Sequence, residues 1–250
     1  MKKVIALCNQ KGGVGKTTCS LNIGAGLEKT GKKVLLIDLD PQAHLTYCLG
    51  IPAHEVKQSL YEVFTKGIPL TEVLMERSGL TLLPSSLDLS GVEMELAGTP
   101  GREFLLREAL EPVEGFDYIL IDCPPSLGLL TLNALTAARE IYIPLQTEFL
   151  ALKGMSKLLE TIETVRKRLN RDLAITGIIA TRFDARKKLN KGIVENITER
   201  FGKTLFRTFI RENISLAEAA GYGQTIFEYA PKSYGAQDYL ALAREMVRRK

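Results

Sequence analysis

The sequence predicts an α/β protein, with a doubly wound, mostly parallel sheet flanked by helices. Short apolar runs alternate along the chain with segments of helical periodicity, which is the element order of such folds. The runs are almost uninterrupted by polar residues, as expected of strands that helices cover on both faces. Because 250 residues can bury one full core, we expect a single domain over residues 1–250.

The expected strands and helices follow from these two periodicities. The apolar runs predict strands at 4–8, 34–39, 80–83, 118–121, 141–145, 174–180 and 205–210. Helices are predicted at 16–29, 59–66, 70–77, 101–110, 127–138, 150–169, 189–201, 214–220 and 234–249. Gly31 and Gly202 are expected to end the helices before them, and Ser233 to cap the last helix. The segment from about 50 to 100 is the least regular, and we expect it to form a cap or a partner surface.

A glycine-rich segment follows the first expected strand and opens the first helix. Residues 10–18 read QKGGVGKTT. Backbone amides in such a turn converge on anionic oxygens, and the helix N-terminus adds a partial positive charge. Lys16 would add a full charge for the outer phosphates, and the Thr17 hydroxyl would bind Mg²⁺. A glycine-rich turn that binds nothing is the alternative, which the order of strand, glycines, lysine, threonine and helix disfavours.

The carboxylates with the clearest placement follow two other strands. Asp122 ends the run 118–121, where a buried strand places a carboxylate that binds Mg²⁺ directly or through water. Asp38 and Asp40 lie at the end of the run 34–39. Either could orient an attacking water, or both could bind loop amides and magnesium waters, and the residues alone leave this open. All these groups should meet at the carboxyl edge of the sheet.

Composition narrows the class of protein less sharply. A net charge of +4 and a pI near 8.8 permit binding to nucleic acid or anionic membrane and require neither. The four cysteines form no C-x-x-C pair and only two histidines occur, which argues against zinc and redox motifs. We expect reduced, mostly buried thiols in a cytoplasmic protein. Neither a signal peptide nor an apolar run of membrane length is recognised.

Three segments, KGGVGKTT, DLDPQ and DCPPS, resemble the ParA/Soj family of deviant Walker A ATPases, and the likeness extends over nearly the whole chain. The general P-loop pattern would place glycine where Gln10 stands, and a second lysine, Lys11, precedes the paired glycines. The resemblance implies a P-loop ATPase with ATP and Mg²⁺ as cofactors, slow intrinsic turnover and an ATP-sandwich homodimer. It also implies that a side chain at Gly12 would obstruct the dimer.

The same resemblance implies roles for individual residues. Lys11 would reach the phosphates of the partner subunit, Lys16 would bind the β and γ phosphates in its own subunit, and Asp40 would position water. Thr17 and Asp122 would hold Mg²⁺. The nucleotide-binding set is Lys11, Gly12, Gly13, Val14, Gly15, Lys16, Thr17 and Thr18.

Partners are implied by resemblance as well. Members of this family segregate chromosomes or plasmids, bind nonspecific DNA as ATP-bound dimers, and are released when a ParB-like partner stimulates hydrolysis. The DNA candidates here are Arg186, Lys187, Lys188, Lys203 and Arg207, with Arg182, Lys191 and Arg211 as further cations. Ser215 stands where the family has an arginine, and Arg211-Glu212 where it often has proline-arginine. Both departures weaken the DNA interpretation.

Two alternatives stay open. A MinD-like or cargo-positioning ATPase would act on a protein or membrane partner. If the partner is a membrane, the last expected helix would bind it through an apolar stripe that precedes a basic end. The stripe consists of Tyr239, Leu242, Ala243 and Met246. We expect this stripe to pack on the domain instead. A nucleotide-binding metabolic enzyme, such as an amidotransferase-linked ligase, would need a substrate pocket that the sequence does not reveal.

Overall fold

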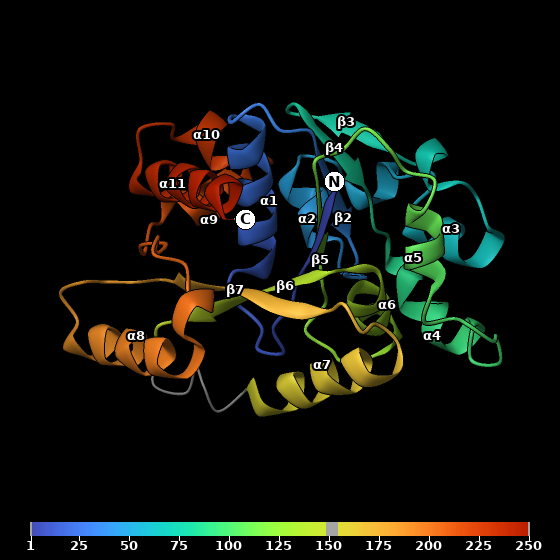
Figure 1. Ribbon diagram of the computed structural model, residues 1–250. Helices are drawn as coiled ribbons and strands as arrows, with labels where there is room; N and C mark the ends of the chain where they lie inside the picture. Colours follow the sequence, from blue (N-terminus) through green and yellow to red (C-terminus); the bar gives the residue numbers. More distant parts are fainter. Residues whose placement is uncertain (1, 149–154, 250) are drawn as a thin grey trace.

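A seven-stranded sheet forms the centre of the protein in the computed structural model, which describes residues 2–148 and 155–249 (Figure 1). Its order is β3-β4-β2-β5-β1-β6-β7, and every pairing is parallel except that of β3 with β4. The strands are β1 (Lys3–Leu7), β2 (Val34–Asp38), β3 (Met75–Arg77), β4 (Leu80–Leu83), β5 (Tyr118–Asp122), β6 (Glu140–Gln146) and β7 (Ala174–Thr181). The predicted doubly wound, mostly parallel sheet is confirmed.

Helices cover both faces of this sheet (Figure 1). They are α1 (Lys16–Glu28), α2 (His44–Cys48), α3 (Leu60–Lys66), α4 (Val92–Glu95), α5 (Leu105–Leu110), α6 (Leu129–Ala137), α7 (Ser156–Arg168), α8 (Lys188–Phe201), α9 (Ser215–Gly221), α10 (Ile226–Tyr229) and α11 (Tyr234–Arg248). Successive residues of β1 point to opposite faces: Ile5 packs with α1 and α11, and Ala6 with the layer of α3 to α8. The two cores are therefore separated only by the sheet.

The last helix packs against the first. Tyr239, Leu242 and Met246 of α11 are buried in the same core as α1. Gly26 permits the close approach, because a Cβ there would lie 3.0 Å from the Ala243 Cβ. The apolar stripe is thus part of the core, as expected. Within the described ranges, no helix is long and apolar enough to cross a membrane.

Two predicted elements are wrong. Residues 205–210 do not form a strand, because the amides of Arg207 and Thr208 donate to the Glu245 carboxylate of α11 rather than to a neighbouring strand. The amides of Phe206 and Ile210 donate to the β7 carbonyls of Ile178 and Ala180, but the pairing is interrupted between them and leaves one isolated bridge, between Ile178 and Leu205.

Residues 70–77 were expected to be helical, but they form a short 3-10 turn (Leu70–Glu72) and then β3. Ser78 and Gly79 both have positive φ, at 53° and 74°, as the two-residue turn of a β-hairpin requires. This turn pairs β3 with β4. Helix α7 begins at Ser156, and the expected start at 150 lies outside the described residues. The short helices α2, α4 and α10 were not expected.

Candidate functional site

The glycine-rich loop joins β1 to α1 at the carboxyl edge of the sheet. Gly13 and Gly15 have φ of 73° and 90°, a left-handed conformation that glycine adopts without strain. A Cβ at Gly12, Gly13 or Gly15 would meet no atom within 4 Å, so the loop faces open space. The backbone conformation, and not crowding in the monomer, explains the glycines at 13 and 15.

Side chains at the ends of β6 and β7 bind the backbone carbonyls of the glycine-rich loop. Gln146 Nε2, at the end of β6, donates to the Gly13 carbonyl at 2.9 Å, and Thr181 Oγ1, at the end of β7, donates to the Val14 carbonyl at 2.9 Å. In residues 2–148 and 155–249, the amides of Gly12 to Gly15 have no protein acceptor. The carbonyls are therefore bound to the protein and the amides are available to an anion. Sequence reasoning missed Gln146 and Thr181.

Thr17 and Asp122 meet as the sequence predicts. Thr17 Oγ1 donates to Asp122 Oδ2 at 2.7 Å, and Ser20 Oγ donates to Asp122 Oδ1 at 3.0 Å. Asp122 is buried, and this desolvation raises the pKa of its carboxyl to about 6. A hydroxyl and a carboxylate are hard oxygen donors of the kind that Mg²⁺ prefers, so the pair fits a magnesium site beside the loop.

The two aspartates after β2 lie in different surroundings. Asp38 is fully buried, and its carboxylate accepts from the Thr46 amide at 2.8 Å and the Thr46 hydroxyl at 2.7 Å. Burial, and then the nearby Asp122, raise the pKa of Asp38 to about 7. Asp40 instead lines a cavity, with one oxygen accepting from the Gln42 amide at 3.0 Å. The geometry supports Asp40, and not Asp38, as the carboxylate within reach of a ligand.

Two cavities share the loop as a common wall. One, of about 750 Å³, is lined by Thr17, by Asp40 and by residues between 124 and 128. The other, of about 370 Å³, lies between Gly13, Thr18, the end of β7 and the segment 210–217. We call the smaller one the base cavity. Both volumes are in the usual range for small-molecule sites, and together they suit an elongated ligand whose phosphates lie along the loop.

The two lysines of the motif differ in direction. Lys16 is buried beneath the loop and lines the larger cavity. Lys11 lines neither cavity. Its Nζ lies 3.2 Å from Gln146 Oε1 and 2.9 Å from Glu148 Oε2, and its side chain is 42% exposed. Lys11 therefore faces outward, where a second molecule could meet it.

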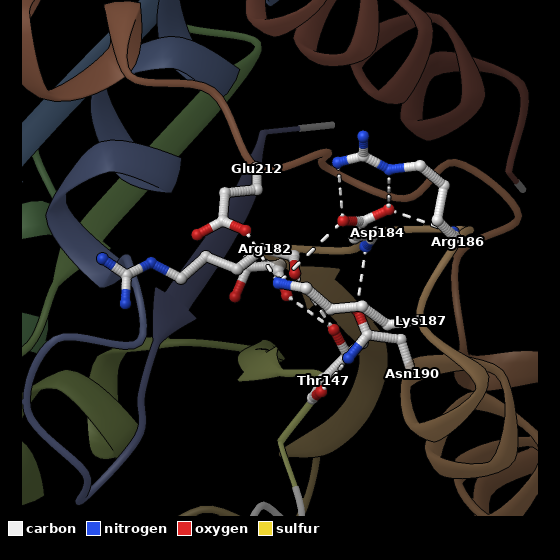
Figure 2. Close-up of polar contacts among 8 residues, drawn as sticks. Thr147, Arg182, Asp184, Arg186, Lys187, Asn190 and Glu212 are labelled. Carbon is white, nitrogen blue, oxygen red and sulfur yellow. Dashed lines mark hydrogen bonds and ion pairs between the residues drawn. The ribbon is translucent and has the colours of Figure 1, made fainter.

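The predicted DNA-binding cations fall into two places. Arg186 binds Asp184 through two nitrogens, at 3.0 and 2.9 Å, and Lys187 lies 3.2 Å from Glu212 (Figure 2). Arg186 holds the pKa of Asp184 down at about 2. Lys203 and Arg207 instead line a groove of about 1000 Å³ between the 202–209 segment and α11. We call this the basic groove. Its other cations are Arg244, Arg248 and Arg249.

Within the described ranges, four cations of the basic groove have no ion-pair partner: Lys203, Arg207, Arg244 and Arg248. Arg249 binds Glu245. The remaining predicted residue, Lys188, is the first residue of α8.

Comparison with known proteins places the chain among nucleotide-dependent ATPases. Residues 2–175 match the family described as AAA domain. The chain is 45% identical over 250 residues to the sporulation initiation inhibitor protein Soj of Bacillus subtilis, covering 99% of each. It is 43% identical to the chromosome partitioning protein ParA of Caulobacter vibrioides, covering 99% of this chain and 94% of that one.

A solved structure is similar over nearly the same length. Cobyrinic acid a,c-diamide synthase from Mycobacterium smegmatis, with a bound ATP analog and magnesium, superposes with a TM-score of 0.89 at 37% identity. The match covers 99% of this chain and 95% of that one. On the evidence of its motifs, its sheet and these relatives, the protein belongs to the ParA/Soj family of P-loop ATPases.

Proposed function

We propose that the protein is an ATP-driven dimerising switch for chromosome or plasmid partitioning. ATP with Mg²⁺ brings two copies together, the dimer holds nonspecific DNA, and hydrolysis stimulated by a ParB-like partner releases it. One observation carries this proposal: a built phosphate site, with open loop amides, Lys16 and the Thr17–Asp122 pair, lies beside an outward-facing Lys11. The names of the relatives support the partitioning role. We place its action in the cytoplasm, at the nucleoid.

Residues in and beside the larger cavity have different roles in the proposed reaction. The amides of Gly12 to Gly15 and the buried Lys16 bind phosphate oxygens. Thr17 and Asp122 would hold Mg²⁺, which when bound neutralises charge on the β and γ phosphates. The Asp40 oxygen that does not accept from Gln42 can accept a proton from a water and align it for in-line attack.

Lys11 supports the dimer. In the monomer its ammonium contacts Glu148 at the surface, and such exposed pairs contribute about 0 to 1 kcal/mol. The phosphates of a partner's nucleotide offer more negative charge and several acceptors, so they can displace Glu148. ATP binding would thus create the site that a second copy completes.

DNA binding is best supported at the basic groove. Four of its cations have no ion-pair partner among the residues that the structure describes, so they can neutralise backbone phosphates without first breaking an ion pair. Arg186 would have to leave Asp184. A dimer doubles these contacts, which gives an affinity that falls steeply with salt.

A test follows from the outward direction of Lys11. Lys11→Ala should abolish the ATP-induced dimer in light scattering and retention on random-sequence duplex, while nucleotide affinity changes by less than about 3-fold. Lys57→Ala, which removes another exposed lysine, is the control and should leave both unchanged. Dimers that persist in Lys11→Ala would contradict the trans role.

A second candidate uses the same switch on a protein cargo. The ion pairing of Arg186 and Lys187 and the serine at position 215 favour it. ATP-dependent dimers without DNA retention at low salt would select this candidate over the first. A membrane target is not favoured, because the apolar stripe of α11 is buried.

A further inference from the structure

We propose that Glu93 is a positioning residue for ATP hydrolysis, whose carboxylate holds the loop between Asp122 and α6 in the place that turnover requires. The inference rests on the magnesium and water roles proposed above for Asp122 and Asp40, and it adds a residue that acts through this loop. Glu93 lies on the short helix α4, far in sequence from the loop that it contacts.

The loop from 123 to 128 joins β5 to α6 and forms part of the larger cavity. It begins directly after Asp122, and most of its residues line the cavity together with Asp40. The Cys123 amide donates to a carbonyl of β1 at 3.3 Å, so the sheet holds the start of the loop. Two consecutive prolines follow, and because proline fixes φ, the loop is a stiff link. A shift at its far end is therefore passed to the residues beside Asp122.

Glu93 binds the far end of this loop, where α6 begins. The N-cap residue of α6 is Gly128, which has no side chain to accept from the first amides of the helix, and those amides need acceptors from outside it. The Leu129 amide donates to Glu93 Oε1 at 2.6 Å. A carboxylate in this place also gains from the helix dipole, and hydrogen bonds to a charged acceptor are among the strong ones. Glu93 therefore fixes where the loop ends.

Gly128 leaves room for this contact. Its φ is −85°, which any residue can adopt, so the backbone itself does not require glycine. A Cβ at position 128 would overlap the Glu93 carboxylate. The close approach of Glu93 thus explains why a side chain is absent at the start of α6.

This arrangement separates the binding of ATP from its turnover. In the proposed site, phosphates are bound by Lys16 and the glycine-rich loop, which belong to α1 and the turn before it. The 123–128 loop instead follows Asp122 and shares a cavity with Asp40. Because a misplacement of about 1 Å can slow a reaction by about 100-fold, loss of the Glu93 contact should slow hydrolysis while ATP still binds.

The experiment measures affinity and turnover separately. An ATP analog that is not hydrolysed would be titrated with Mg²⁺ by calorimetry, and phosphate release would be followed at saturating ATP with Mg²⁺. Glu93→Ala should lower kcat by about 10- to 100-fold and change the dissociation constant of the analog by less than about 2-fold. The stoichiometry of analog binding gives the folded fraction, so kcat is expressed per nucleotide site.

Two conservative variants separate reach from charge at position 93. Glu93→Asp keeps the charge but is one methylene shorter, so it should be as slow as Glu93→Ala. Glu93→Gln keeps the length and an acceptor oxygen, so it should recover most of the rate. Glu95→Ala is the matched control, because Glu95 lies on the same helix and its carboxylate accepts from the Tyr61 hydroxyl at 2.9 Å instead. It should turn over ATP as wild type does.

Gly128→Ala tests the same contact from the side of α6. The added Cβ should displace the Glu93 carboxylate and lower kcat as Glu93→Ala does, and the double variant should be no slower than either single one. Gly91→Ala is the control, because Gly91 has φ of −81° and, among the described residues, a Cβ there would meet no atom within 4 Å. Losses that add in the double variant would contradict the contact as the cause.

The outcomes distinguish this inference from the proposed function. Wild-type kcat in Glu93→Ala, or a loss of analog affinity as large as the loss of rate, would overturn the inference and leave the proposed function intact. Asp122→Asn tests the magnesium role itself and should hydrolyse ATP slowly. If it instead hydrolyses ATP as wild type does, the proposed role of Asp122 fails, and the inference with it.

Discussion

The glycine-rich loop with Lys16, Asp40 and Asp122 forms a phosphate-binding corner at the carboxyl edge of the sheet. The basic loop from 182 to 187 also carries polar groups at this edge, but the two regions differ in how far these groups are buried and paired. In the corner, Lys16 and Asp122 are buried, and Asp122 is hydrogen-bonded before any ligand arrives. In the loop, Arg186 is 91% exposed and bound to Asp184. The corner is organised for one ligand geometry, whereas the loop is a surface whose charges are largely satisfied within the protein.

The number of cations in a region therefore does not measure how many are available to a partner. At the loop, Asp184 and Glu212 pair with the candidate cations Arg186 and Lys187. In the basic groove Glu245 pairs with Arg249, and among the described residues Lys203 and Arg207 have no ion-pair partner.

The largest effect is expected within the corner. Asp40→Ala should lower the rate of ATP hydrolysis by about 100-fold or more, because Asp38, the other aspartate at the end of β2, is buried against Thr46 and does not line the cavity. Affinity for ATP should change little, so the variant should accumulate the ATP-bound dimer. Phosphate release and light scattering measure the two effects. Near-normal hydrolysis would remove Asp40 from the mechanism.

The burial of Asp38 predicts a pH dependence of stability. The folded protein keeps its proton up to a pKa of about 7, whereas the unfolded carboxyl loses it near 3.8. The folded state therefore binds more protons between these values, and the free energy of unfolding falls as pH rises through them, by up to about 4 kcal/mol.

Asp38→Asn cannot titrate, so its free energy of unfolding should vary less than that of wild type between pH 4 and 7. Urea unfolding of the nucleotide-free protein in EDTA gives both curves. Parallel curves for variant and wild type would mean that Asp38 is ionised throughout this range.

At the surface, the basic groove should matter more than the loop. Exchanging Lys203 and Arg207 for glutamate should lower retention on nonspecific duplex by about 10-fold or more at moderate salt and flatten its salt dependence. Arg186→Glu should have a smaller effect, because the wild-type arginine is already bound to Asp184. A larger loss from Arg186→Glu would reverse our assignment of the DNA surface.

The smallest effect is a gain. Asp184→Asn removes the carboxylate that binds Arg186 and also lies 3.9 Å from Lys187. Arg186 then becomes available to DNA, while Lys187 keeps its ion pair with Glu212. Retention should rise by about 2- to 5-fold at low salt and return to the wild-type value at high salt. Unchanged retention at every salt concentration would place the loop outside the DNA surface.

The sequence predicted the corner better than its surroundings. Gly12 to Thr17 lie together because a strand, a turn and a helix follow one another, which is readable locally. Asp122 joins them because β5 pairs with β1, and its place at the end of an apolar run was the sequence signal. Gln146 and Thr181 could not be found in this way, because their contacts depend on β6 pairing with β1 and on β7 pairing with β6. Asp38 and Asp40 were indistinguishable until Thr46 was seen to occupy the first.

Arg186 was a reasonable DNA candidate in sequence, but its partner at position 184 becomes evident only from the loop geometry. The hairpin at Ser78-Gly79 did carry a local signal, a serine-glycine pair between two short runs.

The segment 205–210, which was wrongly predicted to be a strand, has a consequence for self-assembly. It runs beside β7, the last strand of the sheet, and its amides at Phe206 and Ile210 donate to the carbonyls of Ile178 and Ala180. At the opposite end, β3 has only three residues, two of them charged and exposed. Short, charged or covered strands do not recruit further strands. Neither edge of the sheet therefore favours the addition of strands from other molecules, which would lead to fibres. Association must use side-chain surfaces instead.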